Sequence, residues 1–255
     1  MAEKILKFYE ALADHYHLIF DDWNGAIERQ AKVLGVLLAS QTSVYPLKVL
    51  DCACGIGTQA IGFAAMGHHV VASDLSPAEV KRAQYEAQCR SLRISFYVSD
   101  MTSLMEVPEN EFDVVAALDN ALPHLTIAQL GKAAGAIASK LKPKGLFIAS
   151  IRDYDKLILQ KPTIQEPAFF GTHENRRIVH QIWDWIDDTR YVVHLYITAK
   201  SDREWVTHHF VSEYRCVLRD ELSGVLRNAG FGEIEWLMPA EGGFYQPLLL
   251  ARLPG

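Results

Sequence analysis

The residues best suited to chemistry are three aspartates, each of which stands where a predicted strand ends. Asp51 follows the apolar residues 49–50, Asp74 follows the next strand pattern, and Asp100 closes the run at residues 95–98. If these runs form adjacent parallel strands, the three carboxylates line one edge of a sheet. Such an edge attracts a positively charged ligand with hydroxyl groups and repels a phosphate.

A glycine turn lies between the first of these strands and a predicted helix. Gly55 and Gly57 break the chain after Asp51, and a helical pattern begins at Thr58. Glycine lets the backbone approach a ligand closely, and the start of a helix offers free N–H groups, so this stretch is a candidate ligand cradle. With Ala60 the glycines also satisfy the dinucleotide pattern G-x-G-x-x-G/A, but Asp51 at the mouth of the loop argues against a pyrophosphate. The sequence therefore favours a positively charged nucleoside.

Three segments resemble the motifs of class I S-adenosylmethionine-dependent methyltransferases. Asp-Cys-Ala-Cys-Gly-Ile-Gly-Thr at residues 51–58 is similar to the first motif of that family, Val-Val-Ala-Ser-Asp-Leu-Ser at residues 70–76 to its ribose strand, and Val-Ser-Asp-Met at residues 98–101 to its adenine motif. The resemblance implies S-adenosyl-L-methionine as the cofactor and S-adenosyl-L-homocysteine as the product. The cofactor-binding residues that it implies are Tyr16, Trp23, Arg29, Asp51, Ala53, Gly55, Gly57, Asp74, Leu75, Asp100, Met101, Leu118 and His124.

A second candidate site residue follows the fifth predicted strand, which spans residues 146–150. An arginine just beyond the C-terminal end of a parallel strand points into the ligand crevice, and Arg152 occupies that place. Its planar guanidinium suits a carboxylate. The alternative is that Arg152 pairs with Asp153 or Asp155 at the surface.

The loop at residues 118–125 follows the fourth predicted strand. Asn120 can orient an amine or the methionine head of the cofactor, and His124 can support the loop. Methyltransferases that act on the amino groups of nucleic-acid bases carry a [DN]-P-P-[FY] element here, whose aromatic ring stacks on the base. Ala121 and Leu122 stand there instead, so a base is disfavoured as the substrate.

A finer resemblance, to glycine/sarcosine N-methyltransferases, extends from about Tyr9 to Leu250. Its segments include Asp-Asn-Ala-Leu-Pro-His-Leu at residues 119–125, Ser-Ile-Arg-Asp-Tyr-Asp-Lys at 150–156, Gln-Ile-Trp-Asp-Trp at 181–185 and Gly-Phe-Tyr-Gln-Pro at 243–247. This resemblance implies that Arg152 holds an amino acid carboxylate and that Asn120 lies beside the transfer site. Asn120, Arg152 and Tyr16 are therefore the candidate catalytic residues. Residues 161–175, which include Phe169 and Phe170, match no part of that family and could alter which amine fits.

The reaction expected from these residues is an in-line displacement, in which an unprotonated amine nitrogen attacks the sulfonium methyl group. Such a reaction needs alignment and desolvation, and no strong general base is expected. Two alternatives remain: a methyltransferase for another small metabolite, and a non-catalytic module that binds S-adenosylmethionine. A nicotinamide dehydrogenase is a more distant alternative.

The composition of the chain limits the classes of binding partner that we expect. The chain has 255 residues, 49% of them hydrophobic, and a net charge of −6, which argues against nucleic acid or an anionic membrane as the main partner. The expected partner is a small amine that carries a carboxylate, and the expected assembly is a monomer or a small homo-oligomer. The four cysteines show no C-x-x-C spacing and no secretory segment is evident, so we expect reduced thiols, a cytoplasmic location and no metal site.

Alternating helix and strand patterns predict an α/β fold, and the family resemblance implies a Rossmann-like seven-stranded methyltransferase sheet with helices on both faces. We expect an N-terminal helical lid at residues 1–40, a methyltransferase core at 41–153 and 219–255, and a small antiparallel β insertion at 154–218 that covers the substrate site. The expected lid helices span residues 4–18 and 26–38, and capping boxes at Ser76 and Thr126 predict two more helices. Predicted strands of the insertion are residues 176–186, 191–199 and 205–218, with turns at 187–189 and 200–202, and the last two strands are residues 231–237 and 244–250.

Overall fold

The protein is built on two β-sheets. The structure is a computed structural model that describes residues 2–201 and 204–255, so Asp202 of the second predicted turn lies outside the described residues. The larger sheet contains, in spatial order, β10 (Glu233–Leu237), β11 (Leu248–Arg252), β5 (Leu141–Ser150), β4 (Phe112–Ala117), β1 (Lys48–Asp51), β2 (His69–Asp74) and β3 (Ile94–Val98). In this sheet β11 runs opposite to the other six strands, which are parallel to one another. This confirms the predicted seven-stranded α/β fold and its final antiparallel pair.

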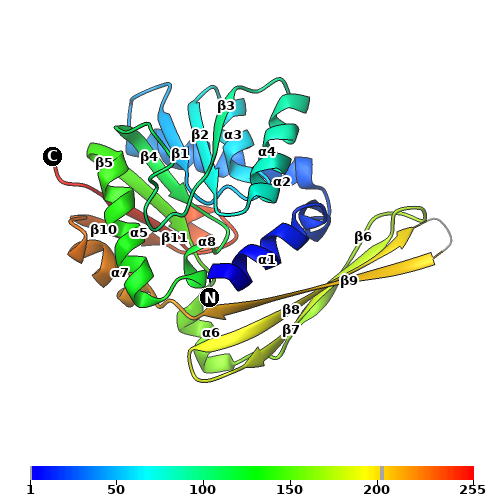
Figure 1. Cartoon of the computed structure of the whole chain (residues 1–255). Helices are drawn as coiled ribbons and strands as arrows, with labels where there is room; N and C mark the ends of the chain where they lie inside the picture. Colours follow the sequence, from blue (N-terminus) through cyan, green and yellow to red (C-terminus); the bar gives the residue numbers. More distant parts are fainter. Residues whose placement is uncertain (1, 202–203) are drawn as a thin grey trace.

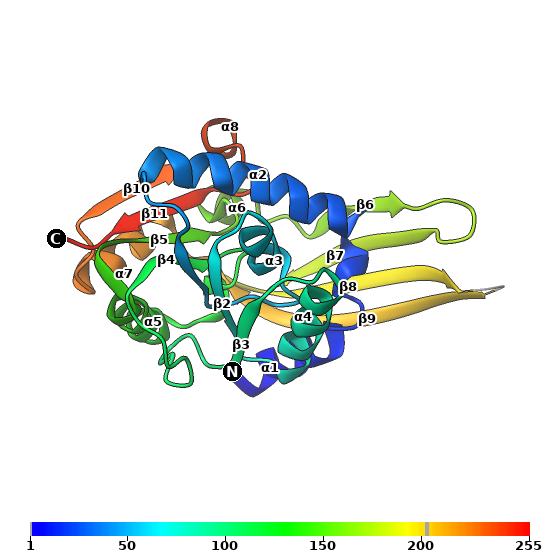
Figure 2. The same cartoon turned by 90° about the horizontal axis from the view of Figure 1, so that it is seen from above.

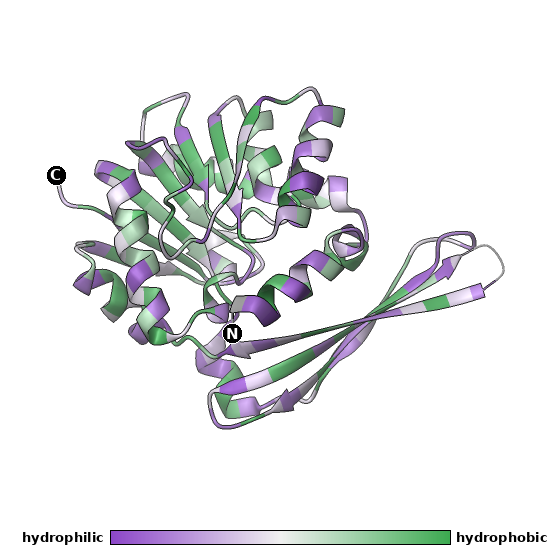
Figure 3. Ribbon diagram, viewed as in Figure 1, coloured by the Kyte–Doolittle hydropathy of each residue, from purple (hydrophilic) through white to green (hydrophobic). Residues whose placement is uncertain are grey.

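Successive residues of each central strand face opposite sides of the large sheet. Val49 of β1 belongs to an apolar cluster with α2 (Trp23–Gln41) and α3 (Thr58–Ala65), whereas Leu50 belongs to a cluster with α5 (Ile127–Lys140) and α7 (Arg219–Asn228). The helix α4 (Pro77–Cys89) packs on the first of these faces, beside α2 and α3. Helices therefore cover both faces, as predicted, and Figure 2 shows α2 and α3 on one side and α5 and α7 on the other. In Figure 3 the strands between them are largely apolar.

The N-terminal segment differs from the predicted pair of helices. Its first helix, α1 (Ala2–Leu12), ends six residues earlier than expected, and a short 3-10 helix, η1 (Tyr16–Ile19), follows. Tertiary contacts override the helical pattern here, because the His15 ring packs against the ring of His208 with centroids 3.9 Å apart. The second helix, α2, begins three residues early, at Trp23.

The insertion after β5 forms a separate antiparallel sheet. It contains α6 (Tyr154–Gln160) and the strands β6 (Ile164–Phe170), β7 (Arg177–Trp185), β8 (Arg190–Ser201) and β9 (Glu204–Arg215), which pair in that order. Three of these strands were predicted. The prediction missed β6, because Pro167 obscures its pattern; a proline is tolerated on an edge strand, and the register shifts between Gln165 and Ala168.

Figure 1 shows α1 between this four-stranded sheet and the core, with the far ends of the strands projecting beyond the core. The remaining elements are the 3-10 helix η2 (Leu122–His124) and the short α8 (Pro239–Gly242). No helix in the described part of the chain is long and apolar enough to cross a membrane.

Two local predictions need correction. The capping box at Thr126 is complete, but the one at Ser76 is only half formed: the Ser76 hydroxyl accepts from the Glu79 N–H, while the Ser76 N–H donates to Asp74 and leaves nothing for the Glu79 carboxylate. The last strand begins at Leu248 instead of residue 244, because the preceding segment contacts the loop after β4, where the Tyr245 hydroxyl donates to Asp119.

The glycine turn after β1 requires glycine at one position in particular. Gly57 has φ +95° at the start of α3, and a Cβ there would lie 3.1 Å from the Cβ of Ala83 and 3.2 Å from Cδ1 of Ile61. We expect Gly57→Ala to lower the free energy of unfolding by about 1–3 kcal/mol, measured by urea denaturation. The matched control is Gly131→Ala in α5, where a Cβ has open space, and it should raise that free energy by about 0.5–1 kcal/mol. Equal effects of the two substitutions would contradict the strain assigned to Gly57.

Candidate functional site

Two cavities meet at the carboxyl ends of the parallel strands. The first lies over the glycine turn between β1 and α3, and the second lies between the core and the four-stranded sheet. Within the described chain, the residues that line both cavities are Tyr9, Tyr16 and Asp119. These three residues therefore mark the passage between the cavities.

Most of the residues predicted to bind the cofactor line the first cavity. These are Tyr16, Ala53, Gly55, Asp74, Leu75, Asp100, Met101, Leu118 and His124. The predicted substrate residues Asn120 and Arg152 line the second cavity, together with Arg29. The structure thus brings together side chains that lie far apart in the sequence. Arg29, which was predicted to bind the cofactor, is placed differently, because α2 directs it to the second cavity.

Three predicted cofactor residues line neither cavity. Trp23 is buried between α2 and α3, where its indole Nε1 donates to Oγ1 of Thr58 at 2.9 Å. Gly57 shapes the turn, and Asp51 lies beneath it with only 1% of its surface exposed. We therefore assign these residues to supporting the cradle, because none of them is placed to touch a ligand in the cavity.

Asp74 and Gly55 form the polar floor of the first cavity. The carboxylate of Asp74 accepts from the backbone N–H groups of Gly55 and Ser76, both at 2.9 Å. Burial raises the pKa of Asp74, while these two hydrogen bonds lower it. Gly55 has φ +50°, and a Cβ there would lie 3.5 Å from the Tyr16 ring, so the backbone is open to a close ligand only because glycine stands there.

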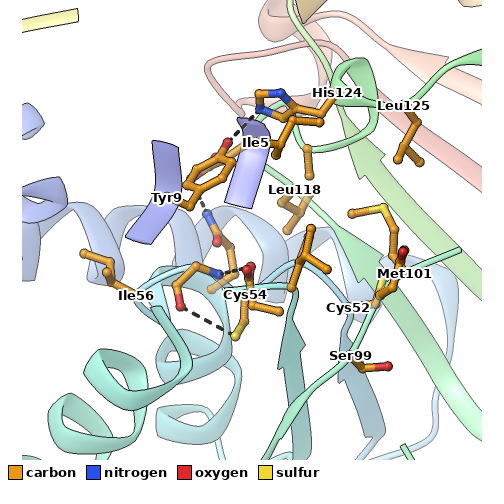
Figure 4. Close-up of a pocket in the computed structure, with 18 of the residues that line it drawn as sticks. Ile5, Tyr9, Cys52, Cys54, Ile56, Ser99, Met101, Leu118, His124 and Leu125 are labelled. Carbon is orange, nitrogen blue, oxygen red and sulfur yellow. Dashed lines mark hydrogen bonds between the residues drawn. The ribbon is translucent and has the colours of Figure 1, made fainter. Parts of the chain in front are cut away.

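The rest of this cavity suits a nucleoside. Figure 4 shows the apolar side chains of Ile5, Ile56, Leu118 and Met101 around the glycine turn. A carboxylate at the end of β2 is placed to accept hydrogen bonds from ribose hydroxyls, and apolar side chains offer contact to a flat base. The residues present therefore fit the predicted cofactor, S-adenosylmethionine.

Tyr9 is a cavity residue that the sequence did not single out. Its hydroxyl lies 2.8 Å from Nε2 of His124, and Figure 4 shows the two side chains pointing toward each other at one end of the cavity. Burial lowers the pKa of His124 to about 3, so the imidazole is neutral. The His124 ring also packs against Tyr214 of β9, at 4.2 Å between centroids, so this pair joins α1, η2 and the insertion. An aromatic residue on an amphipathic helix looks like ordinary core packing, so the sequence pattern alone did not distinguish Tyr9.

The second cavity is large, with a volume of 920 Å³. Its apolar walls come from α1 and from the inner face of the four-stranded sheet, where Val179, Val193 and Leu195 face the core. Phe170 of the unmatched stretch lines this cavity, whereas Phe169 points outward and is 74% exposed.

Arg152 lies in this cavity among neutral groups. Its guanidinium donates to the hydroxyl of Tyr191 at 2.9 Å and packs over the rings of Trp183 and Tyr214, with its Cζ 4.8 and 5.2 Å from their centroids. Among the described residues, no carboxylate pairs with Arg152. Asp153 and Asp155, the partners that the alternative interpretation offered, pair with Arg219 instead, at 2.6 and 3.4 Å.

Asn120 is held in one orientation. Its Oδ1 accepts from the backbone N–H of Arg152 and from the hydroxyl of Tyr154, both at 3.0 Å. A backbone N–H can only donate, so the oxygen must face it and the amide nitrogen Nδ2 must face away. Nδ2 is buried and has no hydrogen-bond partner within the described chain, so one donor of Asn120 is left unsatisfied beside the second cavity.

The buried carboxyl of Asp51 is costly when ionised. Burial raises its pKa to about 7, with a weak hydrogen bond from the Ala53 N–H opposing the shift and the charges of Asp74 and Asp119 adding to it. Because the folded protein holds this proton more tightly than the unfolded chain does, the carboxyl stabilises the fold below pH 3.8 and loses that contribution as the pH rises through 7.

We therefore expect Asp51→Asn to change the pH dependence of stability. Relative to the wild type, the variant should gain about 1.4 kcal/mol per pH unit between pH 4 and pH 7, because asparagine never ionises. Urea denaturation of both proteins without cofactor, at pH 5, 6, 7 and 8, measures this difference. If the free energies of unfolding of the two proteins changed equally with pH, the pKa of Asp51 would not be raised in the folded protein.

Comparisons with known proteins agree with this geometry. Residues 49–145, which run from β1 into β5, match the methyltransferase domain family. A ubiquinone biosynthesis O-methyltransferase of Bradyrhizobium sp. (strain ORS 278) is 30% identical over 173 residues, which are 65% of this chain and 64% of that relative. The chain thus spans less than two thirds of the length of that relative.

Solved structures share the fold. An S-adenosylmethionine-dependent methyltransferase from Clostridium acetobutylicum superposes with a TM-score of 0.74 at 16% identity, covering 89% of this chain and 92% of the other. The sugar N-methyltransferase KedS8 from Streptoalloteichus sp. superposes with a TM-score of 0.74 at 16% identity, covering 90% and 88%. At such identities the likeness concerns the fold.

These comparisons do not show the finer resemblance to glycine/sarcosine N-methyltransferases, which remains a prediction. The comparisons do support the broader resemblance to class I S-adenosylmethionine-dependent methyltransferases. The matched residues 49–145 include the glycine turn, the ribose strand and the adenine motif on which that resemblance was based. S-adenosylmethionine, the cofactor that this domain type uses, agrees with the predicted cofactor. Residues 49–145 are a methyltransferase domain, and the chain has the fold of the class I S-adenosylmethionine-dependent methyltransferases.

Proposed function

We propose that this protein transfers a methyl group from S-adenosylmethionine to the nitrogen of a small amine that carries a carboxylate. The observation that carries the proposal is the unpaired charge of Arg152. A half-buried guanidinium without an anionic partner is costly, and such a group suits a site where a ligand supplies the anion. Glycine and sarcosine are the smallest substrates of this kind, and the finer sequence resemblance favours them.

The two donors in the second cavity support a carboxylate. Arg152 offers the N–H groups of its guanidinium, and Asn120 offers Nδ2, so both present protons toward the ligand. This changes the role proposed for Asn120: its oxygen is occupied, and the free NH₂ group suits a substrate oxygen better than an amine.

The first cavity is proposed to hold the cofactor, with Asp74 at the ribose hydroxyls and Tyr16 between the two ligands. When bound, S-adenosylmethionine supplies a methyl group on a positively charged sulfur, which is already activated for displacement. The residues of the chain then need to align the amine and exclude water. Tyr9 and Tyr16 close the passage from the side of α1 and η1, which is the lid role proposed for residues 1–40.

The volume of the second cavity favours a second candidate, a larger amine. Ligand pockets of about 300–1,000 Å³ bury drug-sized molecules, whereas glycine has only five non-hydrogen atoms. At 920 Å³ the cavity has room for an apolar body along Val179, Val193 and Leu195. An amino sugar, the substrate class that the name of KedS8 indicates for that protein, is one such amine but lacks a carboxylate.

A methyl-transfer assay with S-adenosylmethionine separates these candidates. We expect turnover with carboxylate-bearing amines, tested as glycine, sarcosine and larger α-amino acids, and little with uncharged amines of matched size, with S-adenosylhomocysteine as the readout. Preference for uncharged amines or amino sugars would contradict the role of Arg152. Tight cofactor binding without turnover on any amine would support a non-catalytic binding module.

Variants at Arg152 test the carboxylate contact directly. Arg152→Lys keeps the charge but loses the planar fork, and Arg152→Gln loses both, so kcat/KM on a carboxylate-bearing amine should fall about 10-fold and at least 100-fold, respectively. The dissociation constant for S-adenosylmethionine should stay unchanged, because Arg152 does not line the first cavity. The matched control is Arg190→Gln in β8, where the arginine pairs with Asp187 and Glu213, and it should leave kcat/KM unchanged. Full activity of Arg152→Gln would refute the contact.

A further inference from the structure

We propose that Asp119 accepts the proton that the substrate ammonium must lose before its nitrogen can attack the methyl group. The inference rests on the proposed N-methyl transfer and assigns a catalytic role to a residue that neither the sequence motifs nor the comparisons single out. It adds a base to a reaction for which the sequence analysis expected none.

Asp119 is the acid at the passage between the cavities. Of the three described residues that line both cavities, the other two are tyrosines, and burial raises the pKa of both Tyr9 and Tyr16 well above the ordinary value. Both hydroxyls are therefore neutral at physiological pH. Asp119 is the member of the group that can carry a negative charge where cofactor and substrate meet.

The carboxylate of Asp119 is fixed from two sides. Its Oδ2 accepts from Nε2 of Gln59 at 2.7 Å, and its Oδ1 accepts from the hydroxyl of Tyr245. The backbone N–H of Asp119 donates to Oγ of Ser150 at 2.8 Å. Each carboxylate oxygen thus has one donor and keeps a further lone pair for a proton.

The backbone of this segment is also held in an unusual conformation. Asp119 has φ +55° and Asn120 has φ +68°, both in the left-handed region that few residues adopt. Two consecutive residues of this kind cost free energy and persist only where surrounding contacts enforce them, which is a frequent feature of functional sites. The turn places Asp119 at the passage and Asn120 over the second cavity.

The substrate needs a proton acceptor at the passage between the two cavities, where Asp119 is the carboxylate among the described residues that line both. An amine with an ordinary pKa is an ammonium ion at neutral pH, whereas Arg152 and Nδ2 of Asn120 can only donate. In the proposed step, a proton moves from the ammonium nitrogen to the Asp119 carboxylate. The freed nitrogen lone pair then forms the bond to the methyl carbon, the carbon–sulfur bond breaks with its electron pair remaining on sulfur, and Asp119 passes its proton to solvent.

The surroundings of Asp119 are compatible with this role. Burial raises its pKa, while the hydrogen bonds from Tyr245 and Gln59 lower it. The titratable groups that interact electrostatically with Asp119 are Tyr16 from η1, Asp51 from β1 and Tyr245 before β11. The other titratable or charged residues that line the second cavity are Tyr9, Arg29, Arg152, Asp153, Lys156, Glu166, His180 and Tyr214.

The test compares the wild type with Asp119→Asn over a range of pH. Asparagine tolerates a left-handed φ and keeps the shape of the side chain, so the fold should be preserved. At pH 7, kcat/KM on a carboxylate-bearing amine should fall about 100-fold, and the loss should shrink as the pH approaches the amine pKa and free amine becomes available in solution. The affinity for S-adenosylmethionine, measured by calorimetry, should stay within threefold of the wild type, which also reports a folded site.

A second substrate serves as an internal control. A carboxylate-bearing aromatic amine is unprotonated at neutral pH, so the wild type and Asp119→Asn should methylate it at similar rates. Parallel pH profiles of the two proteins, or an equal loss on both substrates, would overturn the inference while leaving the proposed function intact. A loss of cofactor affinity alone would assign Asp119 to the cofactor and also overturn it. If the wild type methylates no amine, the proposed function itself fails.

Discussion

A half-buried positive charge without a carboxylate partner, that of Arg152, is the constraint on which the second cavity depends. Removing a guanidinium from water costs several kcal/mol unless other groups replace its hydration. Here the replacement comes from the insertion: Trp183 of β7, Tyr191 of β8 and Tyr214 of β9 surround Arg152. The four-stranded sheet thus packs against the core at the place where that charge has to be stabilised.

The register of the insertion makes this arrangement possible. Tyr191 and Tyr214 are directly paired between β8 and β9, and their rings stack at 5.7 Å, while Trp183 stacks on Tyr191 at 4.7 Å. Because side chains alternate along a strand, the residues that flank these three aromatic residues in each strand point to the outer face of the sheet. A register shift of one residue would turn the three rings away from Arg152 and bring outer-face residues such as Asp184 and Glu213 to the inner face.

Short-range sequence patterns predicted most of the residues that line the first cavity. The strand, glycine turn and helix, together with acids after consecutive strands, depend on local backbone requirements that one sequence reveals. Arg152 was found for a similar reason, because its position follows from the end of a parallel strand.

Asp119 and Tyr9 were missed, since their importance arises from which elements the fold brings together. Asp51 was predicted at the mouth of the loop but lies beneath it, because the pattern of a strand end does not reveal how the turn folds over it. The strand β6 was missed because Pro167 hides an edge strand.

The hydrogen bonds around Asn120 run in a single direction. Arg152 can only donate, so Tyr191 accepts from it and gives its own proton to Tyr154, whose hydroxyl in turn donates to Oδ1 of Asn120. No member of this chain can reverse without leaving a donor facing a donor. The second cavity is therefore lined by donors at Arg152 and by an acceptor at Asp119. If the substrate is the zwitterion that we propose, Arg152 would hold its carboxylate and its ammonium group would lie toward Asp119, so the cavity wall would set the orientation of the bound ligand.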